Sequence, residues 1–160
     1  MNDALLQSAL RFHQAGQLME AARLYSDIIR GNPQHFEALY RLGLVHLQSG
    51  RFSDAEHLLT AAIRLQPQVP ETYYVHGCAL QNLERHEDAL KSFARALSLK
   101  PDYVEVRNNR GVSLLALRRY EEALACFDRV LSARPGVALV ESNRAAALSG
   151  LDRHAEALEA

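Results

Sequence analysis

The chain has 160 residues, of which 48% are hydrophobic, enough for a single domain with a sizeable core. Its 18 Lys and Arg residues balance 19 Asp and Glu residues, and the net charge of −1 argues against a general nucleic-acid binder, which carries a basic excess. No apolar stretch has the length of a membrane helix, and the start lacks the pattern of a secretory signal. The isolated cysteines, Cys78 and Cys126, predict a cytoplasmic protein without a disulfide framework or a zinc site.

A small residue recurs every 34 residues along the chain. Its occurrences are Ala9, Gly43, Gly77, Gly111 and Ala145. Gly111 lies within NRGVSLLAL, a stretch with helical spacing, where glycine costs about 1 kcal/mol relative to alanine. A small residue kept at that cost predicts the close approach of a neighbouring helix.

Other residue types follow the same period. An alanine recurs at Ala21, Ala55, Ala89, Ala123 and Ala157, and a proline recurs at Pro33, Pro67, Pro101 and Pro135. A large residue recurs at Tyr25, Leu59, Phe93 and Phe127, followed three residues later by Ile28, Ala62, Ala96 and Val130. Agreement of several columns at one period indicates internal repetition.

Helical spacing predicts two helices in the segment 104–137, one over 104–117 and one over 120–133. The turn between them is short, and Pro135 ends the second helix. Each unit is therefore expected to be an antiparallel helix pair. One pair cannot bury its apolar faces alone, whereas stacked pairs can, which predicts an all-α solenoid.

These columns resemble the tetratricopeptide repeat, whose 34-residue motif has Gly at position 8, Ala at position 20, Phe at position 24 and Pro at position 32. Placing Pro33 at position 32 gives units 2–35, 36–69, 70–103, 104–137 and a partial unit 138–160. The resemblance implies a right-handed α-solenoid of antiparallel helix pairs forming a single domain over residues 1–160. The fifth unit reaches Ala157, within its expected second helix, shortly before Ala160, so we expect the N-terminal part of a longer protein.

Two apolar positions of the motif carry charge in the later units. Position 4 is Arg107 and then Glu141 in the last two units, and position 7 is Arg110 and then Arg144. The apolar stems of arginines at these positions can cover the core while their guanidinium groups reach water.

The resemblance also implies a function, because first helices of the family line a concave groove. We expect a non-catalytic protein–protein interaction scaffold that binds a peptide or a partner helix of unknown identity there. The candidate groove residues are Glu37, Tyr40, Arg41, Glu71, Tyr74, Glu105, Asn108, Asn109 and Asn143.

Each kind of groove residue has two interpretations. The column Glu37, Glu71 and Glu105 is either an acidic rail for basic peptides or ordinary helix N-terminal acid. The pair Tyr40 and Tyr74 either anchors a partner or packs between repeats.

Asn109 and Asn143 share position 6 of the motif. In O-linked N-acetylglucosamine transferases, asparagines here form a ladder along the groove, and an amide can donate to and accept from a peptide backbone. The stretches NNRG and RRYEEALACFDRVL resemble bacterial members of that branch. The alternative function is therefore a substrate-recruiting module of a larger enzyme such as an O-linked glycosyltransferase; otherwise these asparagines serve only solubility.

Catalytic chemistry has little support in the sequence. No nucleotide-binding, nucleophile-elbow or HExxH motif occurs, so we expect no enzyme, no cofactor and no metal. His46, His76 and Cys78 are able to approach one another across helices, but packing explains the histidines more simply. We expect no nucleic-acid or membrane partner, and self-association through an exposed C-terminal repeat face is a further hypothesis.

Overall fold

The protein is a stack of helices, as predicted. The computed structural model describes the backbone of residues 2–159 and the side chains of residues 3–152, and this part contains nine α-helices and no strand. The helices are α1 (Asn2–Gln14), α2 (Leu18–Gly31), α3 (Phe36–Gln48), α4 (Phe52–Leu65), α5 (Pro70–Asn82), α6 (His86–Leu99), α7 (Val104–Ala116), α8 (Tyr120–Ala133) and α9 (Ala138–Glu159). The two helices predicted in segment 104–137 are confirmed, within one residue at each end.

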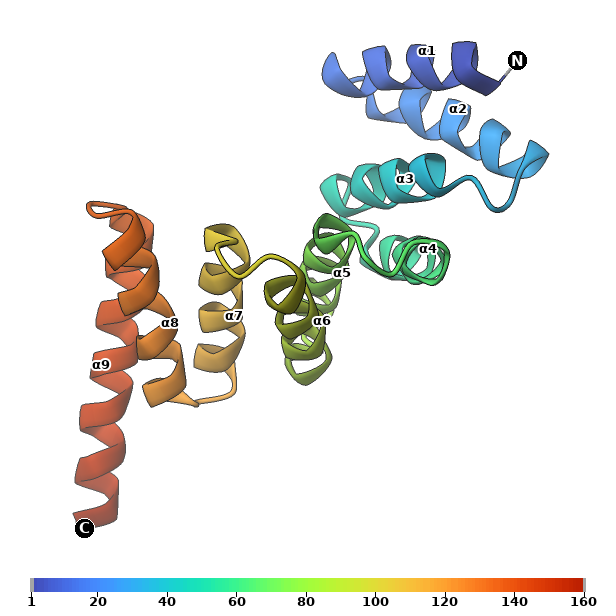
Figure 1. Ribbon diagram of the computed structural model, residues 1–160. Coiled ribbons are helices and arrows are strands. Elements are labelled where there is room, and N and C mark those ends of the chain that lie inside the picture. Colours follow the sequence, from blue (N-terminus) through green and yellow to red (C-terminus); the bar gives the residue numbers. More distant parts are fainter. Residues whose placement is uncertain (1, 160) are drawn as a thin grey trace.

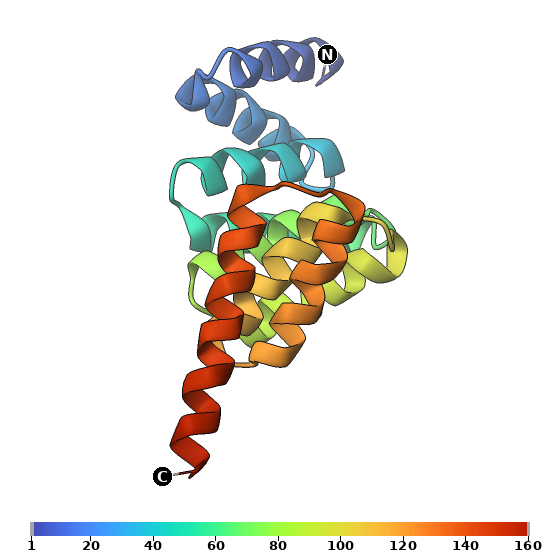
Figure 2. The same cartoon turned by 90° about the vertical axis from the view of Figure 1, so that its left-hand side faces the viewer.

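The helices are arranged as pairs that follow one another along the stack (Figure 1). Each helix packs on the next one in the chain, and the two termini lie at opposite ends of the stack (Figures 1 and 2). The apolar side chains form four local clusters instead of one central core. This arrangement is a solenoid, in which each unit is stabilised by its neighbours.

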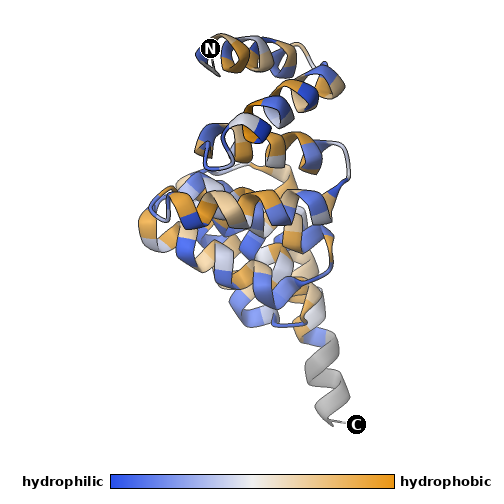
Figure 3. Cartoon of the chain, turned by 90° about the vertical axis from the view of Figure 1, so that its right-hand side faces the viewer, coloured by the Kyte–Doolittle hydropathy of each residue, from blue (hydrophilic) through white to orange (hydrophobic). Residues whose placement is uncertain are grey.

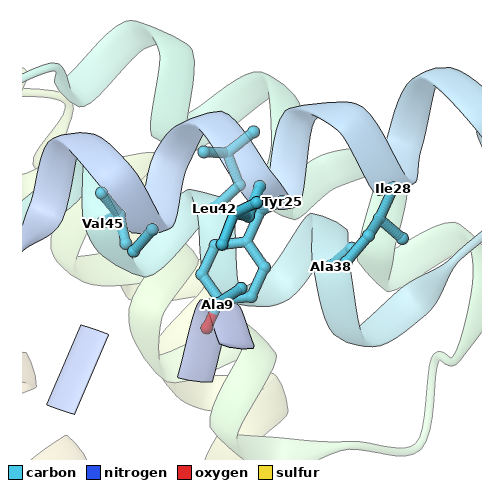
Figure 4. Close-up of a cluster of buried hydrophobic side chains, with 8 residues drawn as sticks. Ala9, Tyr25, Ile28, Ala38, Leu42 and Val45 are labelled. Atoms are coloured by element: carbon cyan, nitrogen blue, oxygen red, sulfur yellow. The ribbon is translucent and has the colours of Figure 1, made fainter. Parts of the chain in front are cut away.

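The repeated columns form these clusters. The large residue of each full unit is fully buried, as are the alanines four residues before it. Figure 4 shows the first cluster, with the ring of Tyr25 beside Ala9 and Leu42. Ala157, the last alanine of its column, lies outside the described side chains.

Apolar and polar residues alternate along the helices, which are amphipathic (Figure 3). Among the described residues, no helix combines the length and the apolar character needed to cross a membrane.

The glycines of the small-residue column lie directly against a side chain of a neighbouring helix, which confirms the predicted close approach. A Cβ atom added at Gly43 would lie 2.8 Å from Cγ of Leu59, and one at Gly111 would lie 2.5 Å from Cε1 of Phe127. The neighbour is the second helix of the same unit. Ala145 is exposed instead, because no second helix covers α9 among the residues that the structure describes.

A residue with positive φ closes the turn between the helices of each full unit. These residues are Gly16 (φ 74°), Gly50 (φ 73°), Glu84 (φ 58°) and Arg118 (φ 58°). The left-handed conformation costs an L-residue about 1–2 kcal/mol. Packing of the two helices offsets this cost where the residue is not glycine.

The fifth unit differs from the prediction. Its turn position is Asp152, but α9 continues through it to Glu159, so the expected second helix around Ala157 does not form. Continuing the helix instead adds a backbone hydrogen bond with each residue.

Candidate functional site

The first helices of the second to fifth units lie side by side and provide the face that carries the candidate residues. Helix α3 contacts α5, α5 contacts α7, and α7 contacts α9, whereas the second helices make no comparable contacts in the described part of the chain. The first helices therefore lie on the inner side of the curve that the stack follows.

A pocket of about 240 Å³ opens on this face between α5, α7 and the start of α9. Four of the nine candidate residues line it, namely Tyr74, Glu105, Asn108 and Asn109. Val137 and Leu139 add an apolar side, and Leu139 is 66% exposed. The pocket thus combines amides, a carboxylate, a phenol and open apolar surface.

A chain of amide contacts crosses three first helices beside this pocket. Asn109 Nδ2 donates to Cys78 Sγ at 3.3 Å and to the Tyr74 hydroxyl at 3.5 Å. Asn108 Nδ2 donates to Asn109 Oδ1 at 3.4 Å, and Asn143 Nδ2 donates to Asn108 Oδ1 at 3.5 Å. The three distances to oxygen, 3.4–3.5 Å, are long for hydrogen bonds, so the amides can exchange these contacts for a ligand's groups at little cost.

The structure shows the inter-repeat packing expected for Tyr74, whereas its role as an anchor for a partner stays a prediction. Its ring centroid lies 5.3 Å from that of Tyr103 and 6.5 Å from that of Phe93, so it packs between repeats, and it also lines the pocket. Burial raises the pKa of Tyr74, and the adjacent Cys78 raises it further. Its hydroxyl is therefore a neutral hydrogen-bonding group near pH 7.

Tyr40 lies outside the pocket. Its ring stacks on Phe36, with centroids 6.1 Å apart and planes 1° apart, and the Arg41 guanidinium carbon lies 5.8 Å from its centroid. Tyr40 and Tyr74 pack against the same apolar cluster.

The glutamate column is neutralised by neighbouring cations. Glu37 pairs with Arg41 at 2.6 Å within α3. The other two pair with cations that end the second helix of their own unit, Glu71 with Lys100 at 3.7 Å and Glu105 with Arg134 at 2.7 Å. A backbone hydrogen bond in the first helical turn lowers the pKa of Glu105, and Arg134 lowers it further. The geometry favours ordinary helix N-terminal acids over an acidic rail.

Sequence reasoning missed Tyr103, Lys100 and Arg134. Burial raises the pKa of Tyr103 to about 12, and Lys100 Nζ lies 4.5 Å from the centroid of its ring. The 34-residue period could have pointed to these residues. Lys100 and Arg134 are 34 residues apart, and Val137 of the pocket follows Tyr103 by the same interval.

His76 and Cys78 have separate surroundings. His76 Nδ1 lies 2.9 Å from Ser92 Oγ and His76 Nε2 lies 3.2 Å from Thr60 Oγ1. Burial raises the pKa of the Cys78 thiol, which keeps it protonated. Within residues 3–152, no three His, Cys, Asp or Glu side chains are grouped to hold a metal ion.

We expect His76 to make stability depend on pH. Burial lowers its pKa; Arg85 also lowers it, while Glu56 and Asp88 oppose the change. The unfolded chain then binds more protons, so the contribution of His76 is complete above the unfolded pKa of about 6.5 and is lost as the pH falls below it. Between about pH 7.5 and pH 5.5, the unfolding temperature of His76→Gln should fall by less than that of wild type. Equal drops would contradict this.

Comparisons with known proteins agree with this architecture. A family model described as tetratricopeptide repeat matches residues 6–70 and 74–138. No curated protein sequence gives a significant match. A crystal structure of MamA protein superposes with a TM-score of 0.89 at 21% identity, covering 99% of this chain and 86% of that chain.

Two further solved structures share the fold. MamA from Desulfovibrio magneticus RS-1 has a TM-score of 0.81 at 22% identity, covering 86% of this chain and 78% of that chain. A mutant O-GlcNAc transferase from Thermobaculum terrenum has a TM-score of 0.75 at 27% identity, covering 82% of this chain but 26% of that chain. The fold is typical of non-catalytic protein-interaction modules. The chain belongs to the tetratricopeptide repeat family.

Proposed function

We propose that the chain is a scaffold that binds an extended peptide or a partner helix on the face of its first helices. The observation that carries this proposal is the pocket lined by Tyr74, Asn108 and Asn109, because it places loosely bonded amides next to the exposed side chain of Leu139. Amides can hold a peptide backbone of any sequence, and the apolar side takes up a side chain.

The remaining candidate residues extend this surface toward the N-terminus. Glu37, Tyr40 and Arg41 lie on α3, and Glu71 lies at the start of α5, so a ligand longer than the pocket would pass over them. Asn143 on α9 adds a further amide at the opposite end.

Asn109→Ala should weaken binding of a peptide selected from a random library by about tenfold, because the variant loses one hydrogen bond between its amide and the peptide backbone. Affinities would be measured by fluorescence anisotropy, with circular dichroism confirming that the variant is folded. Lys91→Ala, an exposed change on the second helix α6, is the matched control and should leave the affinity unchanged. A library that yields no binder, or equal affinities for all three proteins, would contradict the proposal.

The alternative proposal is that this scaffold recruits substrates for a larger enzyme. It draws support from the similarity to the O-GlcNAc transferase, of which the chain covers 26%. Incubating the selected peptides with UDP-N-acetylglucosamine and a lysate of the source organism tests it. Sugar transfer to Ser or Thr of those peptides supports recruitment, and selected peptides without an acceptor residue argue for a plain scaffold.

A second copy of the chain is the partner that we propose for the far end of the stack. On α9, Leu148 is 37% exposed and Ala145 is also exposed, whereas Leu114, the counterpart of Leu148 in the preceding unit, is fully buried under α8. Sedimentation velocity should show a mass that rises with concentration and a monomer for Leu148→Glu. A monomer mass for wild type at every concentration would contradict self-association.

We also propose a cytoplasmic location, since Cys78 and Cys126 are both free thiols, which suits a reducing compartment.

A further inference from the structure

Unit 104–137 brings two arginines together where the preceding unit pairs an arginine with an aromatic ring. In the preceding unit, the guanidinium carbon of Arg95 lies 5.9 Å from the centroid of Tyr73, which is a cation–π contact. The residues 34 positions later are Arg129 and Arg107. The two repeat positions that hold a ring and a cation in the preceding unit therefore hold two positive charges in unit 104–137.

Arg107 and Arg129 line a pocket of about 370 Å³ between the N-terminal half of α7 and the C-terminal half of α8. Arg107 Nη2 donates to the backbone carbonyl of Pro101 at 2.6 Å, which anchors that side chain at the edge of the pocket. The remaining N–H groups of Arg107 have no hydrogen-bond partner among the described residues. Arg129 is exposed and lines the same space.

The charge around this pocket is predominantly positive. Burial lowers the pKa of Arg107, and the positive charges of Arg129 and Arg110 lower it further, with Cys126 opposing the change, so Arg107 is repelled by both of these arginines. Asp102 is the acidic residue lining the pocket, and it forms no ion pair with these arginines in the described part of the chain.

Acids next to the pocket are already paired with other cations. Asp128 accepts from Arg144 Nε at 2.6 Å, and Glu105 accepts from Arg134 Nη1 at 2.7 Å. Neither carboxylate is then available to neutralise the arginines of the pocket.

We propose that this pocket binds a phosphate group between Arg107 and Arg129. Guanidinium groups present paired N–H donors that match the oxygens of phosphate, and a doubly charged anion neutralises both arginines where one carboxylate would neutralise one. The site is separate from the first-helix groove, because Val104 and Val130 line both pockets and stand between them. It is therefore independent of the proposed scaffold function.

The test compares thermal unfolding of the 160-residue chain in sodium phosphate and in sodium chloride at equal ionic strength near neutral pH. Wild type should unfold at a higher temperature in phosphate. Arg129→Gln should lose this difference, and titration calorimetry should show phosphate affinity lowered by about tenfold or more. Arg95→Gln is the matched control, since it removes the same charge at the same repeat position beside an aromatic ring, and it should keep the full response.

A second arm identifies the source of the phosphate. A phosphoserine peptide that binds about tenfold more tightly than inorganic phosphate, while its unphosphorylated form does not bind, indicates a phosphorylated protein partner. Binding of inorganic phosphate but not of the phosphopeptide indicates a small free anion. Equal unfolding temperatures in phosphate and chloride, or an unchanged phosphate response in Arg129→Gln, would overturn the proposal.

Discussion

Phe127→Ala should lower the free energy of unfolding by about 3–5 kcal/mol, the largest loss that we expect from a single substitution. The side chain is fully buried in the cluster that joins α7, α8 and α9, with Leu114 and Val140 in the same cluster. Removing the ring takes away its apolar contacts and leaves a cavity that flanking helices close only in part. Urea unfolding followed by circular dichroism measures the loss.

The control for this prediction is Phe52→Ala, because Phe52 is partly exposed at the start of α4. Phe52→Ala should lower the free energy of unfolding by clearly less than Phe127→Ala does. Equal losses would mean that burial in the repeated column does not set the stability of the unit.

Gly111→Leu should lower the free energy of unfolding by about 1–3 kcal/mol through overpacking. A Cβ atom added at this position would lie 2.5 Å from Phe127 Cε1, and the longer leucine side chain must push α7 and α8 apart. Gly31→Ala is the control, because nothing lies within 4 Å of a Cβ atom there, and it should be neutral or slightly stabilising. An unchanged unfolding midpoint for Gly111→Leu would refute the close-approach explanation.

The double variant Gly111→Leu/Phe127→Ala sharpens this prediction. The leucine enters the space that the ring leaves, so the double variant should lose less stability than the sum of the two single losses. Strict additivity would show that the two residues do not compete for the same space.

The helix pairs and their contacts were predictable because each repeated column corresponds to one recurring contact. Gly111 and Phe127 meet in one unit as Gly43 and Leu59 meet in another, so the 34-residue period carries the packing with it. The end of the chain was not predictable in this way. Ala145 belongs to the same column but is exposed, because its burial depends on a second helix that α9 does not provide.

The candidate groove was predictable in part. Repeat positions correctly grouped Tyr74, Asn108 and Asn109, since residues at matching positions of neighbouring first helices lie side by side. The period alone did not reveal that Arg134 neutralises Glu105, because that contact joins a first helix to the end of a second helix. The contribution of Tyr103 was missed for a similar reason, because it lies in a connection outside the helical pattern.

The central claim is that the face of the first helices is the working surface of the scaffold. Its most direct test places a photo-crosslinking amino acid at Leu139, which lines the groove pocket, or at Lys91, which is exposed on α6, and irradiates each protein in a lysate of the source organism. We predict protein adducts from position 139 that disappear when Tyr74→Ala and Asn109→Ala are added, and no matching adducts from position 91. Matching adducts from both positions, or adducts that survive the two groove substitutions, would contradict the claim.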